Sequence, residues 1–276
     1  MRNRTWIAGA AALAGLAAYA FLVEPRWIQL RRSRIHIRSL PPGLEGLRIG
    51  LLTDIHGRGP RAGSLVQRAV RLLARERPDL IAITGDLAED APGLYAVVRA
   101  LAPLRAPLGV YTVPGNHDHR AGIDDWRRAV HGGTRARDLT NRYVLLRHRG
   151  ARLCVGGVDD YYEGRPVLVL PPPGTRDLTV LLAHAPDQAE RSRRDWDAVD
   201  LVVSGHTHGG QVRLPFLGPP IRSTEHDDLY EEGLRRRPWT QVYTSRGLGT
   251  TRLPVRFLTR PEVSVLTLTG APRPPR

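Results

Sequence analysis

Five apolar segments of the sequence are each followed by side chains that bind divalent metal ions in proteins. The segments cover residues 47–53, 79–84, 109–114, 178–183 and 200–204, and they lead into Asp54-Ile55-His56, Gly85-Asp86, Gly115-Asn116-His117-Asp118, His184 and Gly205-His206-Thr207-His208. A single Asp or His after such a segment is usually an ordinary turn residue. The five together offer carboxylate, amide and imidazole donors, and this combination predicts a metal site.

The donor set fits a centre with two divalent ions. Two ions about 3.5 to 4 Å apart need a short anionic ligand that bridges them, and further ligands that leave positions free for water and substrate. Asp86 is the natural bridge in this sequence. Imidazole and amide donors keep the site from becoming strongly negative, so a phosphate anion is able to approach, and this favours a phosphate substrate over a neutral one.

Buried strands of an α/β domain are expected to position these residues. The apolar segments are rich in Val, Ile and Leu, and they alternate with Arg- and Ala-rich stretches that have helical spacing. A strand buried on both faces is apolar along its length, so its polar side chains emerge at the carboxyl end, where sites of open α/β sheets lie. The single cysteine, Cys154, excludes an intrachain disulfide and a cysteine-rich zinc site.

The order of the motifs D-x-H, G-D, G-N-H-D, H and G-H-x-H resembles the signature of the calcineurin-like metallophosphoesterase superfamily. The resemblance runs from Asp54 to His208. Further motifs resemble the membrane-associated bacterial branch, which includes the YkuE-like proteins and a UDP-2,3-diacylglucosamine pyrophosphatase of lipid A synthesis. These motifs are Gly209-Gly210-Gln211, Gly247-Leu248-Gly249, Leu253-Pro254-Val255-Arg256-Phe257 and Pro261-Glu262.

The resemblance implies an α/β fold, a four-layer α/β/β/α sandwich in which two mixed sheets lie face to face and helices cover them on the outside. We expect an N-terminal transmembrane or signal-anchor helix before this domain. The expected boundaries are 1–25 for the membrane anchor or signal segment, 26–46 for a basic linker and lead-in, 47–270 for the metallophosphoesterase domain and 271–276 for a tail.

The resemblance also implies a role for each motif residue. One ion would be held by Asp54, His56, Asp86 and His208, and the other by Asp86, Asn116, His184 and His206. His117 resembles the family's catalytic histidine, which contacts the phosphate and protonates the leaving oxygen. Asp118 would either orient the ring of His117 or cap the following helix. The implied reaction is hydrolysis by a hydroxide that bridges two ions, and manganese, iron and zinc all suit these ligands.

The leader from Trp6 to Val23 carries no charge and is close to the shortest helix that crosses a bilayer. Its Ala18-Tyr19-Ala20 would suit a signal peptidase, so cleavage is one alternative. An uncleaved anchor is favoured, because Glu24-Pro25-Arg26 would end the helix where water begins. We therefore expect a single-pass protein of the bacterial cell membrane.

The side of the membrane is predicted from the arginines that flank the leader. Arg26, Arg31, Arg32, Arg34 and Arg38 follow it, and only Arg2 and Arg4 precede it. Because positive charge tends to stay in the cytoplasm, this count favours a cytoplasmic domain, with export as the alternative.

The net charge of +14 comes from arginines that are scattered along the chain. No basic stripe interleaved with aromatic residues stands out, so we expect a solvated basic surface and no specific nucleic-acid site. No pattern in the sequence indicates an oligomeric state.

The predicted function is hydrolysis of a phosphodiester or diphosphate, and the anchor favours a lipid-linked nucleotide such as UDP-2,3-diacylglucosamine as the substrate. One alternative is a membrane-attached phosphodiesterase or phosphatase of broad specificity. Another is a metal-bound scaffold or polyanion binder without catalysis. His119, which follows the third motif, and Asp159, which follows a Gly-rich segment, are further candidates for contact with the substrate.

Overall fold

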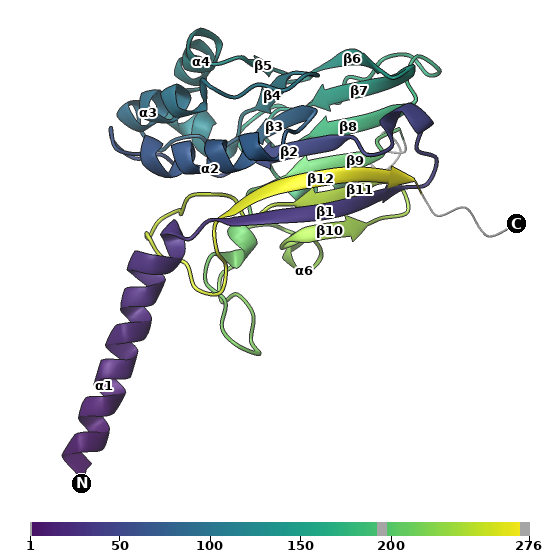
Figure 1. Ribbon diagram of the computed structural model, residues 1–276. Coiled ribbons are helices and arrows are strands. Elements are labelled where there is room, and N and C mark those ends of the chain that lie inside the picture. The colour runs from purple at the N-terminus through teal and green to yellow at the C-terminus, as the bar shows by residue number, and fades with distance from the viewer. Residues whose placement is uncertain (1, 192–197, 271–276) are drawn as a thin grey trace, which may run out of the picture.

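The computed structural model describes residues 2–191 and 198–270, and its body consists of two six-stranded sheets (Figure 1). The expected tail at 271–276 lies outside the described residues. The first sheet has the spatial order β1 (Gln29–Ile37), β12 (Glu262–Gly270), β2 (Arg48–Leu52), β3 (Leu80–Thr84), β4 (Val110–Val113) and β5 (Ala136–Asp138).

The second sheet has the order β10 (Gly233–Arg236), β11 (Gln241–Thr244), β9 (Leu201–Ser204), β8 (Leu178–Leu182), β7 (Ala151–Gly157) and β6 (Arg142–His148). Both sheets are mixed. The pairs β12–β2, β10–β11 and β6–β7 are antiparallel, and the other neighbours are parallel. The expectation of two mixed sheets in an α/β fold is therefore confirmed.

Apolar side chains from both sheets meet between them. Leu51 and Tyr111 of the first sheet and Val180 and Val203 of the second belong to one buried cluster. All five residues of β3 and all five of β8 are buried, so these strands meet water on neither face. This double burial explains why the strands are apolar along their length and why their polar side chains come only after their carboxyl ends.

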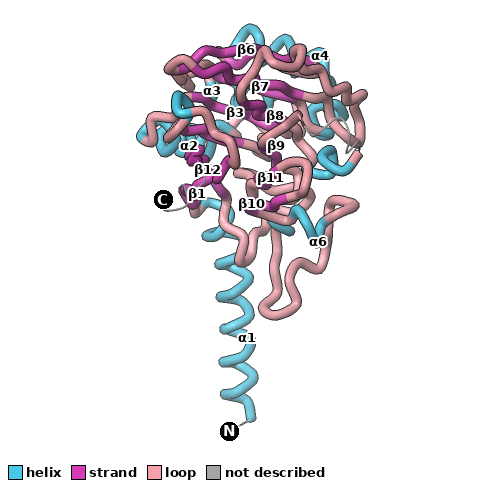
Figure 2. The backbone as a smooth tube through the Cα atoms, turned by 90° about the vertical axis from the view of Figure 1, so that its right-hand side faces the viewer, coloured by secondary structure: helices cyan, strands magenta, loops and turns pink. Residues whose placement is uncertain are grey.

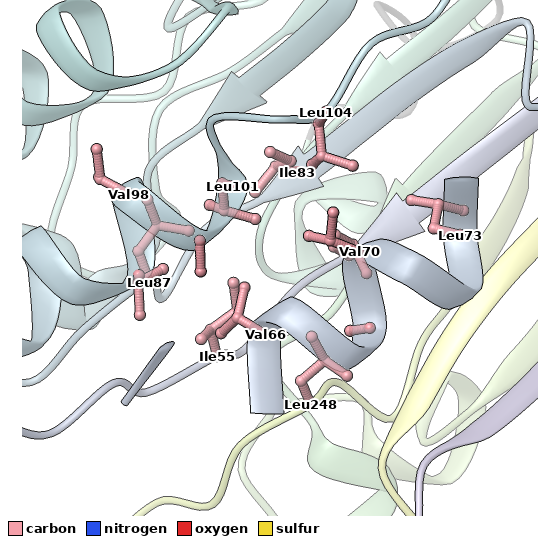
Figure 3. Close-up of a cluster of buried hydrophobic side chains, with 14 of the residues drawn as sticks. Ile55, Val66, Val70, Leu73, Ile83, Leu87, Val98, Leu101, Leu104 and Leu248 are labelled. Atoms are coloured by element: carbon pink, nitrogen blue, oxygen red, sulfur yellow. The ribbon is translucent and has the colours of Figure 1, made fainter. Parts of the chain in front are cut away.

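Three helices cover the outer face of the first sheet: α2 (Gly63–Arg75), α3 (Ala91–Leu101) and α4 (Asn116–Gly133). Figure 3 shows side chains of this layer, among them Val66, Val70 and Leu73 of α2. Their spacing of four and three residues places them on one side of the helix, facing the sheet. The start of α3 is fixed by Asp90, whose side chain accepts a hydrogen bond from the backbone N–H of Gly93 at 2.6 Å.

The outer face of the second sheet has a different cover. Its buried Leu181 and Val202 belong to a cluster with Ala189 of η4 (Pro186–Glu190) and Tyr230 of α6 (Asp227–Tyr230). These helical segments have five and four residues. Within the described part of the chain, the expected outer layer of helices is therefore present on the first sheet, while short segments and loops cover the second.

The leader forms a helix that extends away from the sheets (Figure 2). Helix α1 (Arg2–Ala18) has 17 residues and continues as the π-helical η1 (Tyr19–Val23) and the 3-10 turn η2 (Glu24–Arg26). Among the described residues, no helix combines the length and the apolar character of a membrane span. The expected transmembrane helix is not confirmed, since the regular α-helix stops at Ala18 and consists largely of Ala and Gly.

The segment that was expected to be a basic linker contains a strand. Nine residues of this segment form β1 and pair in parallel with β12, which lies more than 230 residues further along the chain. Ile35 and Ile37 are buried between the sheets, whereas Arg32 reaches Glu76 with hydrogen bonds of 3.0 and 2.7 Å. The alternation of buried and exposed side chains is that of an edge strand, and the arginines of its outward face gave the segment its linker-like composition.

Candidate metal centre

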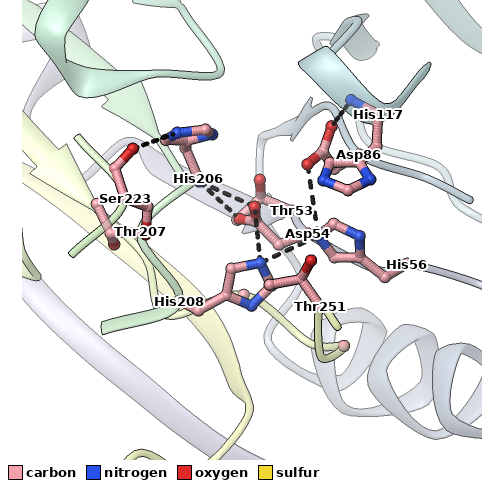
Figure 4. Close-up of polar contacts among 12 residues, drawn as sticks. Thr53, Asp54, His56, Asp86, His117, His206, Thr207, His208, Ser223 and Thr251 are labelled. Atoms are coloured by element: carbon pink, nitrogen blue, oxygen red, sulfur yellow. Dashed lines mark hydrogen bonds and ion pairs between the residues drawn. The ribbon is translucent and has the colours of Figure 1, made fainter. Parts of the chain in front are cut away.

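The five motifs meet at one edge of the two sheets. Strands β2, β3 and β4 of the first sheet and β8 and β9 of the second end there, and each leads directly into its motif. Figure 4 shows Asp54, His56, Asp86, His206 and His208 around one centre. The structure thus brings together the seven residues that the sequence predicts as ligands: Asp54, His56, Asp86, Asn116, His184, His206 and His208.

The backbone at this edge is unusual. Five of the seven candidate ligands have positive φ: Asp54 (50°), His56 (47°), Asp86 (54°), His206 (70°) and His208 (53°). Side chains other than Gly adopt this conformation rarely and at a cost of about 1 to 3 kcal/mol each. Strained residues cluster at functional sites, where the direction of a side chain is fixed. Here the positive φ angles direct the side chains after successive strands towards one point.

Two motif glycines are required by close approach. A Cβ atom on Gly115 would overlap Oδ1 of Asp86, and a Cβ atom on Gly205 would overlap Oδ2 of Asp54. The carboxylates therefore lie against backbone that carries no side chain. The Asp54 carboxylate also accepts the backbone N–H of His206 at 2.9 Å, which joins the end of β2 to the end of β9 across the two sheets.

The first group of donors consists of Asp54, His56 and His208. The Nε2 atoms of His56 and His208 lie 3.0 Å apart, and Oδ1 of Asp54 lies 3.6 Å from Nε2 of His208. Donor atoms bound to one metal ion at about 2.1 Å lie roughly 3 to 3.5 Å from one another, so this spacing is that of a ligand set. Nδ1 of His56 faces Oε1 of Glu89 at 2.5 Å, which leaves Nε2 with a free lone pair.

The second group consists of Asp86, Asn116, His184 and His206. Nε2 of His184 lies 3.2 Å from Oδ2 of Asp86, 3.1 Å from Oδ1 of Asn116 and 3.1 Å from Nδ1 of His206. The other ring nitrogens donate outwards, His184 Nδ1 to the carbonyl of Thr84 at 2.7 Å and His206 Nε2 to that of Ser223 at 3.1 Å. If both rings were neutral, both inner nitrogens would be acceptors, and lone pairs would converge with no donor between them.

Such a convergence of acceptors is stable only around a cation. Burial disfavours a charged His184, but the carboxylate of Asp86 outweighs burial and raises the pKa of His184 well above its ordinary value. Burial also disfavours a charged Asp86, and the neighbouring His184 still holds the pKa of Asp86 well below the usual range. Burial and the neighbouring His184 lower the pKa of His206 to about 3, so this ring is neutral. Without a metal, the proton on His184 is the positive charge among these donors. The same donors are suited to bind a divalent ion in its place.

Asp86 stands between the two groups. Its Oδ2 atom lies 3.4 Å from Nε2 of His56 in the first group and 3.2 Å from Nε2 of His184 in the second. Its other oxygen, Oδ1, accepts the backbone N–H of His117 at 2.9 Å. The carboxylate therefore contacts both groups, which is the position of a bridging ligand.

His117 lies at the entrance of the centre, and its orientation is set by a residue that the motifs do not include. Nδ1 of His117 lies 2.9 Å from Oε1 of Glu89, the same oxygen that contacts His56. Glu89 was missed in the sequence. Its position three residues after Asp86, in the loop between β3 and α3, could have indicated that it lies near the centre.

Asp118 binds backbone and does not contact the ring of His117. Its carboxylate accepts the N–H groups of Asp86 at 2.7 Å, Leu87 at 2.9 Å and Gly115 at 2.9 Å. It therefore ties the loop after β3 to the start of α4. This is the capping role of the two alternatives for Asp118, while Glu89 takes the orienting role.

His119 and Asp159 pair with each other. His119 Nε2 lies 2.7 Å from Oδ1 of Asp159, and this hydrogen bond raises the pKa of His119. Asp159 lines a separate cavity together with Arg127 and His131. Neither residue lines the cavity of the metal centre, so the structure does not place these two candidates next to a substrate in it.

A cavity of about 650 Å³ opens over the donor groups. His56, Asp86, His117, His206 and His208 form its polar floor. Its walls combine arginines with apolar and aromatic side chains: Arg120, Tyr162, Val212, Ile221, Arg222, Leu253 and Val255. The cavity is large enough for an organic phosphate, and its walls offer both cationic and apolar contacts.

Comparisons with known proteins agree with the order and geometry of these motifs. The family model of the calcineurin-like phosphoesterases matches residues 47–210. The uncharacterized metallophosphoesterase YkuE of Bacillus subtilis is 34% identical over 268 residues, which cover 95% of this chain and 92% of YkuE. The phosphodiesterase YaeI of Escherichia coli is 30% identical over 278 residues, covering 97% of this chain and 98% of YaeI.

A longer relative comes from Danio rerio and is named a transmembrane protein with metallophosphoesterase domain. It is 31% identical over 279 residues, and the match covers 93% of this chain and 61% of that protein.

Proposed function

The chain belongs to the calcineurin-like phosphoesterase family of metal-dependent hydrolases, and we propose that it cleaves a phosphodiester or diphosphate bond at a centre with two divalent ions. The observation that carries this proposal is the pair of donor groups that share Asp86, with Oδ2 within 3.4 Å of His56 in one group and 3.2 Å of His184 in the other. One ion would be too few for seven inward-facing donors.

The two donor groups divide the ligands. Asp54, His56, Asp86 and His208 would hold one ion, and Asp86, Asn116, His184 and His206 the other. Manganese, iron or zinc in these positions would supply positive charge for the phosphate oxygens and lower the pKa of bound water. Asp54 and Asp86 are fixed by backbone N–H groups, so the chain holds its carboxylates in place before an ion arrives.

His117 is the proposed general acid. Because its Nδ1 is bound by Glu89, only Nε2 is left to exchange a proton with a substrate. The ring is partly exposed, at 22%, and lies on the cavity wall beside Asp86. In this position it is suited to protonate the oxygen that leaves when the phosphate ester is cleaved. Glu89 would act as a positioning residue for both His117 and His56.

The walls of the cavity support an amphiphilic phosphate ester as the substrate. Arg120 is paired with Glu163, so the charge offered to a second phosphate comes from Arg252, which also lines the cavity. Ile221 and Leu253 offer apolar surface. A lipid-linked nucleotide such as UDP-2,3-diacylglucosamine has both features. The second candidate is a phosphodiesterase of broad specificity, which is favoured by the likeness to YaeI, a protein named as a phosphodiesterase.

Attachment to a membrane through the leader is part of the proposal. The helix carries apolar side chains that no other part of the described chain covers, with Trp6 exposed at 74%, Leu13 at 70% and Leu22 at 60%. Uncovered apolar side chains of this size are more stable in a lipid phase than in water. The proposed catalytic unit then follows the leader and includes β1.

Hydrolysis assays on two substrates test the proposal. The full chain in detergent, with manganese, is given bis-p-nitrophenyl phosphate and UDP-2,3-diacylglucosamine, and Asp86→Ala and His117→Ala serve as controls. Cleavage of either substrate that is lost in both variants supports a two-ion hydrolase, and selective cleavage of the lipid nucleotide supports the lipid-linked substrate. No cleavage of either with manganese, iron or zinc would refute the proposal.

A further inference from the structure

A second cleft lies beside the metal centre at the base of the leader helix. It has a volume of about 500 Å³ and lies between η2, the start of α2 and the segment from Thr250 to Pro254. Five arginines line it: Arg26, Arg58, Arg61, Arg68 and Arg252. We call this space the arginine cleft.

The arginine cleft holds an excess of positive charge. No carboxylate lines it within the described part of the chain, although Glu89 lies 3.8 Å from the exposed guanidinium of Arg58. Among the described residues, the guanidinium groups of Arg61, Arg68 and Arg252 have no hydrogen-bonding or ion-pair partner.

Some arginines elsewhere in the fold are neutralised by carboxylates. Arg32 and Arg48 share the carboxylate of Glu76 at 2.7 Å each, and Arg152 binds Asp177 with several hydrogen bonds. In the arginine cleft, Arg26 donates to the carbonyl oxygen of Leu22 at 2.6 Å and Arg58 lies near Glu89, which leaves the other three guanidinium groups without a partner in the part of the chain that the structure describes. Planar guanidinium groups that line one cleft without a partner are suited to bind a phosphate group.

Much of the remaining lining is apolar, and this favours a ligand that has an apolar part. Phe21, Leu65, Leu253 and Pro254 face the same space as the arginines. A small hydrated phosphate would gain nothing from these side chains, whereas an amphiphile would use both kinds of surface.

The position of the cleft matches such a ligand. Phe21 and Arg26 belong to the segment that joins α1 to the body, so the cleft opens where the uncovered apolar helix begins. Figures 1 and 2 place the loop after η5 (His208–Gly210) on the same side of the molecule as α1. This loop carries Phe216, exposed at 108%, and Leu217, exposed at 80%.

We propose that the arginine cleft binds the phosphate headgroup of an anionic amphiphile whose apolar part lies along the leader helix. The cleft is adjacent to the metal centre, since His56, Arg252 and Leu253 line both cavities, but apart from His56 none of the seven candidate metal ligands lines it. It is therefore a binding site for a phosphate group that is not itself cleaved.

Charge substitutions on one helix test this proposal. The double variant Arg61→Gln/Arg68→Gln removes two cleft arginines, and the control Arg71→Gln/Arg75→Gln removes two exposed arginines of α2 that do not line the cleft. The full manganese-loaded chain is released from maltoside micelles, and native mass spectrometry measures the binding of phosphatidylglycerol and of phosphatidylcholine with the same acyl chains. Glycerol 3-phosphate is added as a soluble competitor.

We expect phosphatidylglycerol to bind more tightly than phosphatidylcholine, and the cleft variant to weaken its binding by about tenfold while the control changes it by less than about twofold. If glycerol 3-phosphate displaces phosphatidylglycerol, the cleft recognises the phosphate group alone. If it does not, the cleft recognises the phosphate group and the acyl chains together. Equal binding by the two double variants would overturn the proposal. Hydrolysis of bis-p-nitrophenyl phosphate is measured in parallel, and we expect it to be the same in both, so failure of the cleft and failure of the catalytic proposal are distinguishable.

Discussion

The ends of strands β3 and β7 resemble each other in sequence but differ in structure. Each is followed closely by an acidic residue: Gly85 and Asp86 come after β3, and Val158 and Asp159 come after β7, which ends at Gly157. Asp86 contacts His56 and His184 from other strands. Asp159 accepts the backbone N–H groups of Asp160 and Arg165 at 2.9 Å and binds His119 at 2.7 Å.

The comparison shows what makes an acid at a strand end into a ligand. Asp159 is satisfied by its own loop and one nearby histidine, so no cation is needed there. Asp86 lies where imidazoles from both sheets point inward, and its Oδ2 atom is left to these rings. A strand-end acid is therefore a candidate metal ligand where other strands deliver their donors to the same point.

The largest expected effect is a difference in activity between variants of Asp86 and Asp159. Asp86→Ala is expected to lower kcat/KM for bis-p-nitrophenyl phosphate by about a thousandfold or more, because both donor groups lose the carboxylate that they share. Asp159→Ala should leave the value nearly unchanged, since Asp159 does not line the cavity of the metal centre. Steady-state kinetics with saturating manganese measures both. Similar losses in the two variants would show that Asp159 belongs to the site.

A smaller effect is expected at Glu89, which links the two histidines at the edge of the centre. Glu89→Gln removes the charge that holds His56 and His117, and we expect kcat to fall about ten- to hundredfold. Glu76→Gln is the control, because Glu76 also binds two side chains but lies away from the centre. A change in KM alone, with kcat retained, would contradict a positioning role for Glu89.

The close approach of backbone to carboxylate predicts a loss of stability. A Cβ atom at residue 205 overlaps Oδ2 of Asp54, so Gly205→Ala should lower the free energy of unfolding by about 2 kcal/mol. A Cβ atom on Gly132 in α4 meets open space, and Gly132→Ala should be neutral or stabilising by up to about 1 kcal/mol. Urea unfolding followed by circular dichroism measures both. Equal stability of the two variants would show that the edge of the sheets relaxes easily.

The smallest effect concerns the interior of β7, as distinct from its end. Cys154 is fully buried, and burial raises the pKa of its thiol to about 11. We expect the thiol to react with Ellman's reagent at pH 8 only after the chain is unfolded, because the thiolate is the reactive form. Rapid reaction in the native protein would mean that the space between the sheets opens readily.

The sequence predicted most of the site because the motifs are local. Each ligand candidate follows a doubly buried strand, and such strands are recognisable from their apolar composition. The convergence of His184 and His206 with Asn116 follows from the parallel order of the strands, which the resemblance supplied. The two mixed sheets were predictable for the same reason.

Other features depend on contacts that no local pattern encodes. Glu89 gains its role only because the fold places His117 beside it. Strand β1 was hidden by its arginines, and its partner β12 is far away in the sequence. The membrane-spanning helix was predicted from the length of the apolar leader. In the structure the regular α-helix ends at Ala18, and the backbone continues as a π-helix.

The metal content of the full chain tests the central claim most directly. Equilibrium dialysis against manganese, with inductively coupled plasma mass spectrometry, should find two ions per chain in the native protein and in Asp159→Ala. Asp86→Ala should bind fewer than two, because both donor groups lose a ligand. One ion or none in the native protein, or two ions in Asp86→Ala, would contradict the account of a shared carboxylate between two donor groups.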